Sequence, residues 1–225
     1  METSRVSRTK EQARTTYDRL SRWYDLLSEA SEARPRDAGL KRLAVQESET
    51  VLDVGFGTGH SFIALARAAG KTGRVYGIDL SSGMINVARG LVERARMTGG
   101  VRLACGDALS LPFPASSFDA VFMSFTLELF DTPDMPRVLA ECRRVLRAGG
   151  RICVVALCKK EPWTWVTRLY EWAHGQFPSY VDCRPIFVGR AMEDAGLAIL
   201  DAAEMSMWGL PVGIILGREP LKRSG

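Results

Sequence analysis

The sequence predicts a doubly wound α/β domain with a mainly parallel sheet. From residue 50 onward, short apolar stretches alternate regularly with helical stretches, which is the pattern of βαβ units. The first apolar stretch, 51–54, runs directly into a turn rich in glycine, 55–59, and a helical run follows from Ser61. A strand, a turn of small residues and a helix N-terminus form the nucleotide-binding opening of such a sheet.

Length and composition agree with one soluble globular domain. The chain has 225 residues, 46% of them hydrophobic, and a mild formal net charge of +4. No apolar run approaches the roughly 18 residues of a membrane-spanning helix, and the N-terminus lacks the apolar stretch of a signal peptide, so a cytoplasmic location is expected. The five cysteines are scattered and never form a Cys-x-x-Cys pair, so neither a metal site nor a disulfide framework is expected.

Seven strands are expected in all. The five parallel ones are predicted at residues 50–54, 74–78, 101–105, 118–124 and 152–157, and two more, near 197–205 and 212–217, would close the sheet as an antiparallel hairpin. The helix before the fifth strand is expected to carry Pro133 in its first turn and to end at Gly149 and Gly150, because proline favours helix starts and glycine favours helix ends.

Residues 1–45 are expected to form an N-terminal helical cap or lid on the main domain, residues 46–220. An amphipathic stripe runs along this segment at steps of four and three residues, through Ala13, Tyr17, Leu20, Tyr24 and Leu27. Residues 29–41, with Pro35 and Gly39, are interpreted as a break. Residues 1–22 hold six basic residues against three acidic ones, so residues 1–24 could also lie on an anionic membrane surface.

The glycine-rich turn favours a ligand with a positive centre over a dinucleotide. Asp53 stands two positions before the first glycine, where its charge would repel a pyrophosphate. His60 stands where the dinucleotide fingerprint has its last Gly or Ala. Asp79 follows Gly59 by twenty residues, the distance at which an acidic residue reaches ribose hydroxyls. These features indicate S-adenosylmethionine, and they disfavour an NAD-dependent oxidoreductase, as does the absence of any Tyr-x-x-x-Lys.

Several motifs, in the right order over roughly residues 45–157, resemble those of class I S-adenosylmethionine-dependent methyltransferases. They are Val51-Leu52-Asp53-Val54-Gly55-Phe56-Gly57-Thr58-Gly59-His60, Val75-Tyr76-Gly77-Ile78-Asp79-Leu80-Ser81, Gly106-Asp107-Ala108, Leu111-Pro112-Phe113-Pro114, Phe118-Asp119 and Val145-Leu146-Arg147-Ala148-Gly149-Gly150-Arg151. The chain is most similar to the branch of ubiquinone and menaquinone biosynthesis and phospholipid methylation. The resemblance implies a Rossmann-like, seven-stranded fold.

The resemblance also implies a set of cofactor contacts. Asp79 would bind the ribose, Met84 would pack near the adenine, and Asp107 would accept a hydrogen bond from the adenine amino group. The full set of expected cofactor-binding residues is Asp53, Gly55, Phe56, Gly57, Thr58, Gly59, Asp79, Leu80, Met84, Gly106, Asp107, Ala108 and Ser124. The cofactor would leave as S-adenosylhomocysteine, and no metal is expected.

Candidate catalytic residues are few, because methyl transfer mainly needs alignment and exclusion of water. His60 follows the glycine turn, and His174 lies among aromatic residues. Glu128 lies in the loop after the fourth strand, which starts where the methyl group should point, and could orient the acceptor. Tyr17 and Tyr24 could close over the cofactor or assist a phenolic acceptor.

The acceptor is expected to be a small molecule or a lipid. A lipophilic or aromatic, quinone-like acceptor fits the aromatic residues of 161–180, whereas a phosphatidylethanolamine-type amine fits the basic N-terminus. A subunit that binds the cofactor without catalysis is an alternative of another class. Methylation of nucleic acid is disfavoured, because Ser124-Phe125-Thr126-Leu127 replaces the Asn/Asp-Pro-Pro-aromatic motif of many base-modifying enzymes. The oligomeric state stays open.

Overall fold

The computed structural model describes residues 31–97, 99–159 and 184–221. They contain a seven-stranded sheet in the order β3-β2-β1-β4-β5-β7-β6. The strands are β1 Thr50–Val54, β2 Arg74–Asp79, β3 Val101–Cys105, β4 Phe118–Ser124, β5 Leu146–Leu157, β6 Ala198–Met207 and β7 Leu210–Arg218. The first five strands are parallel, and β7 is antiparallel to both β5 and β6. The predicted fold, a mostly parallel sheet with an antiparallel C-terminal hairpin, is confirmed.

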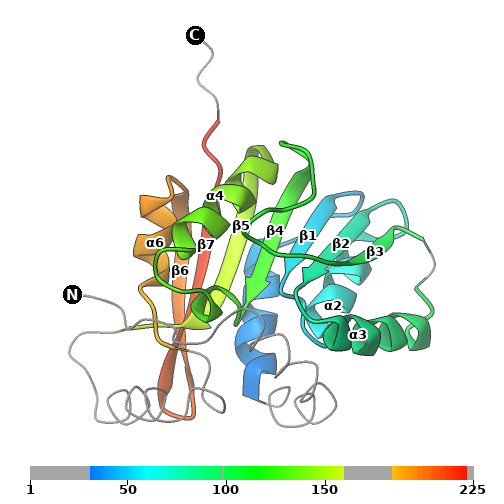
Figure 1. Ribbon diagram of the computed structural model, residues 1–225, viewed down its shortest axis with the longest axis horizontal. Coiled ribbons are helices and arrows are strands. Elements are labelled where there is room, and N and C mark those ends of the chain that lie inside the picture. Colours follow the sequence, from blue (N-terminus) through cyan, green and yellow to red (C-terminus); the bar gives the residue numbers. More distant parts are fainter. Residues whose placement is uncertain (1–30, 98, 160–183, 222–225) are drawn as a thin grey trace.

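Helices cover both faces of the sheet (Figure 1). On one face, α2 (His60–Ala69), α3 (Ser82–Arg94) and the helical residues 31–43 bury apolar side chains in one core cluster. On the other face, α4 (Met135–Val145) and α6 (Val188–Asp194) bury theirs in a second cluster. A short 3-10 helix, η1 (Leu127–Leu129), follows β4. The doubly wound arrangement places the carboxyl ends of all five parallel strands at one edge.

The interpretation of 29–41 as a break is wrong for residues 31–41, which are helical. Gly39 does not interrupt this helix but lets it lie close to the sheet. An added Cβ at Gly39 would come within 2.4 Å of Val155 Cγ2 and 3.2 Å of Phe122 Cε2. The glycine therefore serves helix-to-sheet packing. The expected division into a cap, 1–45, and a domain, 46–220, stays a prediction, and residues 1–30 lie outside the described structure.

The predicted end of the helix before β5 is also wrong. Helix α4 ends at Val145, and β5 begins at once with Leu146, which pairs with Phe118. The next β4–β5 pair joins Ala120 to Arg151, so the pair of glycines, 149 and 150, lies in a bulge of the strand. Gly149 takes a φ of 77° there. The bulge also binds the end of β7, since Gly149 N donates to Glu219 O at 3.1 Å.

Two smaller differences concern a proline and the hairpin. Pro133 precedes α4, and the proline of its first turn is Pro136. The hairpin strands are longer than predicted, so that only Trp208 and Gly209 connect them. Among the described residues, no helix is long and apolar enough to cross a membrane.

Candidate cofactor and acceptor site

The glycine-rich turn links β1 to α2 at the carboxyl edge of the sheet. All three glycines have positive φ angles, 69° at Gly55, 54° at Gly57 and 98° at Gly59. Gly55 N donates to Ile78 O at 2.8 Å, which ties the turn to β2, and Gly59 N donates to Phe56 O at 3.0 Å. Only glycine adopts this sequence of conformations without strain.

The three glycines have different surroundings, and this difference indicates where a ligand could contact the turn. An added Cβ at Gly55 would lie 2.4 Å from Thr126, and one at Gly59 would lie 2.9 Å from Ala88 Cβ on α3. These two glycines let protein segments approach each other. Among the described residues, no atom lies within 4 Å of a Cβ added at Gly57. Gly57 therefore opens towards space in which a ligand can contact the backbone.

Asp79 closes the turn from the neighbouring strand. Its Oδ2 accepts a hydrogen bond from Gly57 N at 3.0 Å, and its Oδ1 accepts one from Ser81 N at 2.9 Å. Ser81 in turn caps α3 through a bond from Met84 N to its hydroxyl, at 3.1 Å. A carboxylate offers about four lone-pair positions, so these two bonds leave Asp79 able to bind ribose hydroxyls as well.

Asp53 is buried beneath the turn, with 1% of its surface exposed. Its Oδ2 accepts a hydrogen bond from Ser61 Oγ at 2.7 Å, and no described residue donates to its Oδ1. Burial raises the pKa of Asp53 to about 7, and the negative charge of Asp79 also raises it. The hydrogen bond from Ser61 and the positive charge of Arg36 lower this pKa, but they do not cancel the effect of burial. A cationic ligand group is a suitable partner for the remaining oxygen.

The raised pKa of Asp53 gives a testable pH dependence. Because its folded-state pKa of about 7 exceeds the ordinary value of 3.8 for an aspartic acid, the folded state binds the proton more tightly than the unfolded state does. This contribution to stability is complete below about pH 4 and is lost as the pH rises through 7. Glu49 and Glu141 affect stability in the opposite direction, because their hydrogen bonds with Arg151 and Arg144 lower their pKa values. Their contribution to stability is lost as the pH falls, in a more acidic range.

We expect Asp53→Asn to flatten the decline in the free energy of unfolding between pH 5 and pH 8, since the amide does not ionise. Urea unfolding of the original chain and of Asp53→Asn, each at pH 5 and at pH 8, measures this decline. If the two profiles run parallel, Asp53 does not titrate in this range.

The other expected cofactor residues lie along the same edge. Gly106 follows β3, and its N donates to Asp79 O at 3.0 Å, which places Asp107 beside the end of β2. Asp107 Oδ1 accepts from Leu109 N at 3.0 Å, so its carboxylate is oriented by its own loop. Leu80 lies between β2 and α3, while Met84 and Ala108 are buried, at 3% and 7% exposure.

Phe56, Gly59 and Ser124, three more of the expected cofactor residues, lie within the packed protein. Phe56 is buried, with its ring centroid 6.0 Å from that of Phe62, so its side chain serves the core. Gly59 packs α2 against α3, as described above. Ser124 has a buried hydroxyl that makes no hydrogen bond with the described residues. Thr58 is half-buried in the turn itself.

Two of the five catalytic candidates are described. His60 is the first residue of α2 and is half-buried, next to the glycine turn. Glu128 lies in η1 and is completely buried, and its Oε1 accepts a hydrogen bond from Leu157 N at 3.1 Å. Glu128 thus ties the loop after β4 to the end of β5. Tyr17, Tyr24 and His174 lie outside the described residues.

Sequence reasoning missed three residues that support the site. Ser61 holds Asp53, Thr126 fills the space beside Gly55, and Arg184 is completely buried under the loop after β4. Arg184 donates to Phe130 O at 2.6 Å and to Thr132 Oγ1 at 3.1 Å. None of the three stands within the methyltransferase motifs given above, although Ser61 directly follows the first of them.

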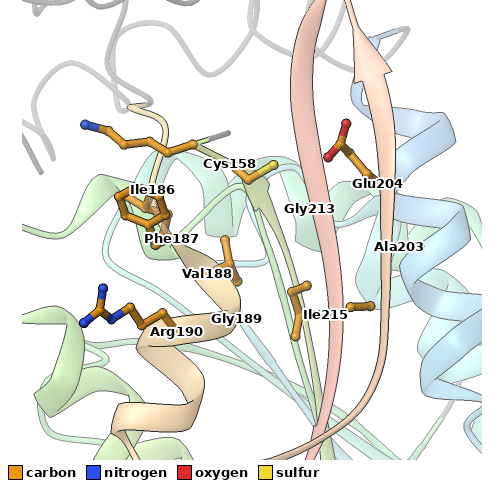
Figure 2. Close-up of a pocket in the computed structure, with 12 residues that line it drawn as sticks. Cys158, Ile186, Phe187, Val188, Gly189, Arg190, Ala203, Glu204, Gly213 and Ile215 are labelled. Atoms are coloured by element: carbon orange, nitrogen blue, oxygen red, sulfur yellow. The ribbon is translucent and has the colours of Figure 1, made fainter. Parts of the chain in front are cut away.

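A separate pocket of about 380 Å³ lies on the α6 face, between α6 and the β6–β7 hairpin (Figure 2). Arg190 and Glu204 lie on opposite sides of it, and Phe187, Val188 and Ile215 line it between them. None of the expected cofactor residues lines this pocket. Among the described residues, no group of His, Cys, Asp and Glu side chains could hold a metal ion.

Known proteins resemble this chain in sequence and in fold. Residues 51–150 match a family described as a methyltransferase domain. Demethylmenaquinone methyltransferase from Geobacillus kaustophilus is 40% identical over 146 residues, which cover 65% of this chain and 60% of that protein. The chain therefore spans about 60% of the length of the curated relatives it matches.

Two solved structures show the shared fold. An S-adenosylmethionine-dependent methyltransferase from Aquifex aeolicus has a TM-score of 0.66 at 24% identity, with 89% of this chain and 97% of that one covered. The [4+2]-cyclase SpnF has a TM-score of 0.75 at 19% identity, with 97% and 100% covered.

The site at the carboxyl edge of the sheet, with Asp53, the turn 55–59 and Asp79, is called the edge site here. The seven-stranded fold, this edge site and the matched residues 51–150 resemble those of class I S-adenosylmethionine-dependent methyltransferases. Within that class, the curated relatives that the chain resembles over 146 and 148 residues are named demethylmenaquinone methyltransferases. The edge site fits the cofactor of this class. The open space at Gly57 admits a ligand to the backbone. Asp53 has a buried oxygen without a hydrogen bond from the described residues, which suits a cationic group, and Asp79 is a hydrogen-bond acceptor of the kind that ribose hydroxyls need.

Proposed function

We propose that this chain transfers a methyl group from S-adenosylmethionine to a lipophilic, quinone-type acceptor. The observation that supports it most is the 40% identity with a protein named demethylmenaquinone methyltransferase over 146 residues. The relatives favour this acceptor over phosphatidylethanolamine. The intact set of Asp53, Asp79 and Asp107 favours catalysis over a subunit that binds the cofactor without catalysis.

In this proposal the bound cofactor supplies an activated methyl group on a good leaving group. The chain's residues then align the acceptor and exclude water. Gly57 and Asp79 would hold the ribose side, and Asp53 would face the cationic end. The loop 125–132 would present the acceptor from the side of β4. His60, Glu128, Tyr17, Tyr24 and His174 remain the candidates for moving a proton or orienting the acceptor.

Residues 1–24 are proposed to contact the membrane in which such an acceptor would dissolve, on the cytoplasmic side. The excess of basic residues over 1–22 would favour an anionic lipid surface. The same segment could close over the cofactor, because both roles use an amphipathic helix.

Asp79→Ala is expected to weaken S-adenosylmethionine binding by more than about tenfold, or about 1.4 kcal/mol. The substitution removes the acceptor of the Gly57 and Ser81 bonds together with the proposed ribose contact. Isothermal titration measures the affinity, and the thermal midpoint shows whether the fold is intact. An unchanged affinity in a folded variant would remove Asp79 from the ribose role.

The acceptor class is tested by transferring label from methyl-labelled S-adenosylmethionine into a fractionated cell extract, with Asp79→Ala as the background control. The proposal expects label in the neutral lipid fraction. Label in phospholipid would instead identify an amine acceptor, and label only in polar metabolites would exclude a lipophilic one. Cofactor binding without label in any fraction would favour the non-catalytic alternative.

A further inference from the structure

The β6–β7 hairpin extends past the end of β5 at the same edge as the cofactor site. Because β5 and β6 are both antiparallel to β7, β6 runs parallel to β5 and ends at the carboxyl edge. The last pair between β5 and β7 is Leu157 with Val212, whereas β6 and β7 stay paired until Met207 and Leu210. Figure 1 shows the hairpin reaching beyond the ends of β4 and β5.

The turn at the tip of this hairpin has an unfavourable residue at its first position. Trp208 and Gly209 connect the strands with φ angles of 52° and 81°, as in the type I′ turns that favour Asn-Gly. A bulky side chain at positive φ is uncommon and strained. Trp208 is 75% exposed, so burial within the protein does not offset this strain. An interaction outside the chain would account for an indole at this position.

We propose that Trp208 inserts into the interface of a phospholipid bilayer and holds the carboxyl edge of the sheet against it. Indole rings favour the boundary between water and hydrocarbon, because they combine a large apolar ring with one polar N–H group. The formal net charge of +4 attracts the chain to an anionic surface. The inference rests on the proposed lipophilic acceptor, which would enter the site from that bilayer.

The test compares vesicle binding by the full chain and by Trp208→Asn, on phosphatidylcholine vesicles containing phosphatidylglycerol. We expect Trp208→Asn to bind about tenfold more weakly, since burying even part of an indole is worth more than 1.4 kcal/mol. The matched control is Leu200→Thr, which removes another exposed apolar side chain, 45% exposed, from β6, the strand that leads to Trp208. It should bind vesicles as the original chain does.

A second readout separates this role from a merely structural one. Asparagine suits positive φ, so Trp208→Asn is expected to raise the thermal midpoint by roughly 2 °C while binding falls. Unchanged vesicle binding by Trp208→Asn would overturn the inference. A dimer that becomes a monomer in the variant, by analytical ultracentrifugation without lipid, would also overturn it, because the partner would then be a second copy of the chain.

Activity measurements distinguish this inference from the proposed function. Transfer to a short-chain quinone acceptor dispersed in detergent should be equal for the original chain and Trp208→Asn. Transfer to a long-chain acceptor in vesicles should fall in the variant. If the original chain methylates neither acceptor, the proposed function fails, whereas the vesicle-binding comparison still decides the role of Trp208.

Discussion

Gly57→Val should abolish measurable binding of S-adenosylmethionine while the chain stays folded. The valine side chain would occupy the space above Gly57, where no atom of the described residues lies within 4 Å of an added Cβ. It would meet the ligand and not the protein. We expect the affinity to fall by more than about 100-fold, or about 2.7 kcal/mol, in isothermal titration. Because φ at Gly57 is 54°, the variant should also lose about 1–2 kcal/mol of stability.

Gly99→Val is the matched control for this experiment. Gly99 also has a positive φ, 82°, and also has open space where a Cβ would be added. It lies between α3 and β3, at the amino end of β3 and so away from the carboxyl edge. The two variants should lose similar stability, but only Gly57→Val should lose the cofactor. Equal affinities in the two variants would mean that the ligand does not lie over Gly57.

Arg184→Met is expected to lower the free energy of unfolding by about 2–4 kcal/mol. Methionine retains the apolar stem but removes the donors to Phe130 O and Thr132 Oγ1, at 2.6 and 3.1 Å, and so leaves these acceptors unsatisfied near a fully buried side chain. Both acceptors belong to the loop after β4. The KM for the acceptor should therefore rise, whereas the affinity for S-adenosylmethionine should change little.

Arg137→Met provides the control for the loss of an arginine. Arg137 pairs with Asp134 at 3.3 Å, and its side chain is 66% exposed. An exposed pair of this kind contributes at most about 0.5 kcal/mol. Urea unfolding of both variants measures the difference. If Arg184→Met is as stable as Arg137→Met, the buried guanidinium does not hold the loop.

The central strands β1 and β4 were readable from the sequence because they are almost entirely buried. Such a strand appears as an apolar run bounded by turn residues, and β1, β3 and β4 were predicted with the bounds that the structure shows. The turn 55–59 and the strand-end residues Asp79 and Asp107 were found for a related reason. They lie at or just after the ends of strands, and in the sequence these ends are visible as the change from apolar residues to turn residues.

Glycines outside that turn were harder to interpret. Gly39 and Gly149 were taken as the signs of a break and of a helix end, whereas one packs a helix on Val155 and the other forms a bulge in β5. A glycine that ends an element and one that permits close packing look alike in a sequence, because the difference lies in distant neighbours. At Trp208 the difficulty is different, because this first residue of the turn between β6 and β7 is not a residue type that is typical of turns.

The residues that support the site from a distance could not be found from the sequence. Thr126 donates to Gly55 O, 71 positions away, and Arg184 donates to Phe130 O, 54 positions away. Neither partner stands at a characteristic spacing. Glu128 was predicted to orient the acceptor, and its bond to Leu157 N adds a structural role that only the assembled sheet reveals.

The most direct measurement is methyl transfer by the purified chain to demethylmenaquinone, with methyl-labelled S-adenosylmethionine and with Gly57→Val as the inactive control. We expect more moles of labelled quinone than of enzyme, a yield that rises linearly with the concentration of the chain, and no product with Gly57→Val. Binding of S-adenosylmethionine without any labelled quinone would contradict the proposed acceptor. Product formation by Gly57→Val at the original rate would contradict the proposed site.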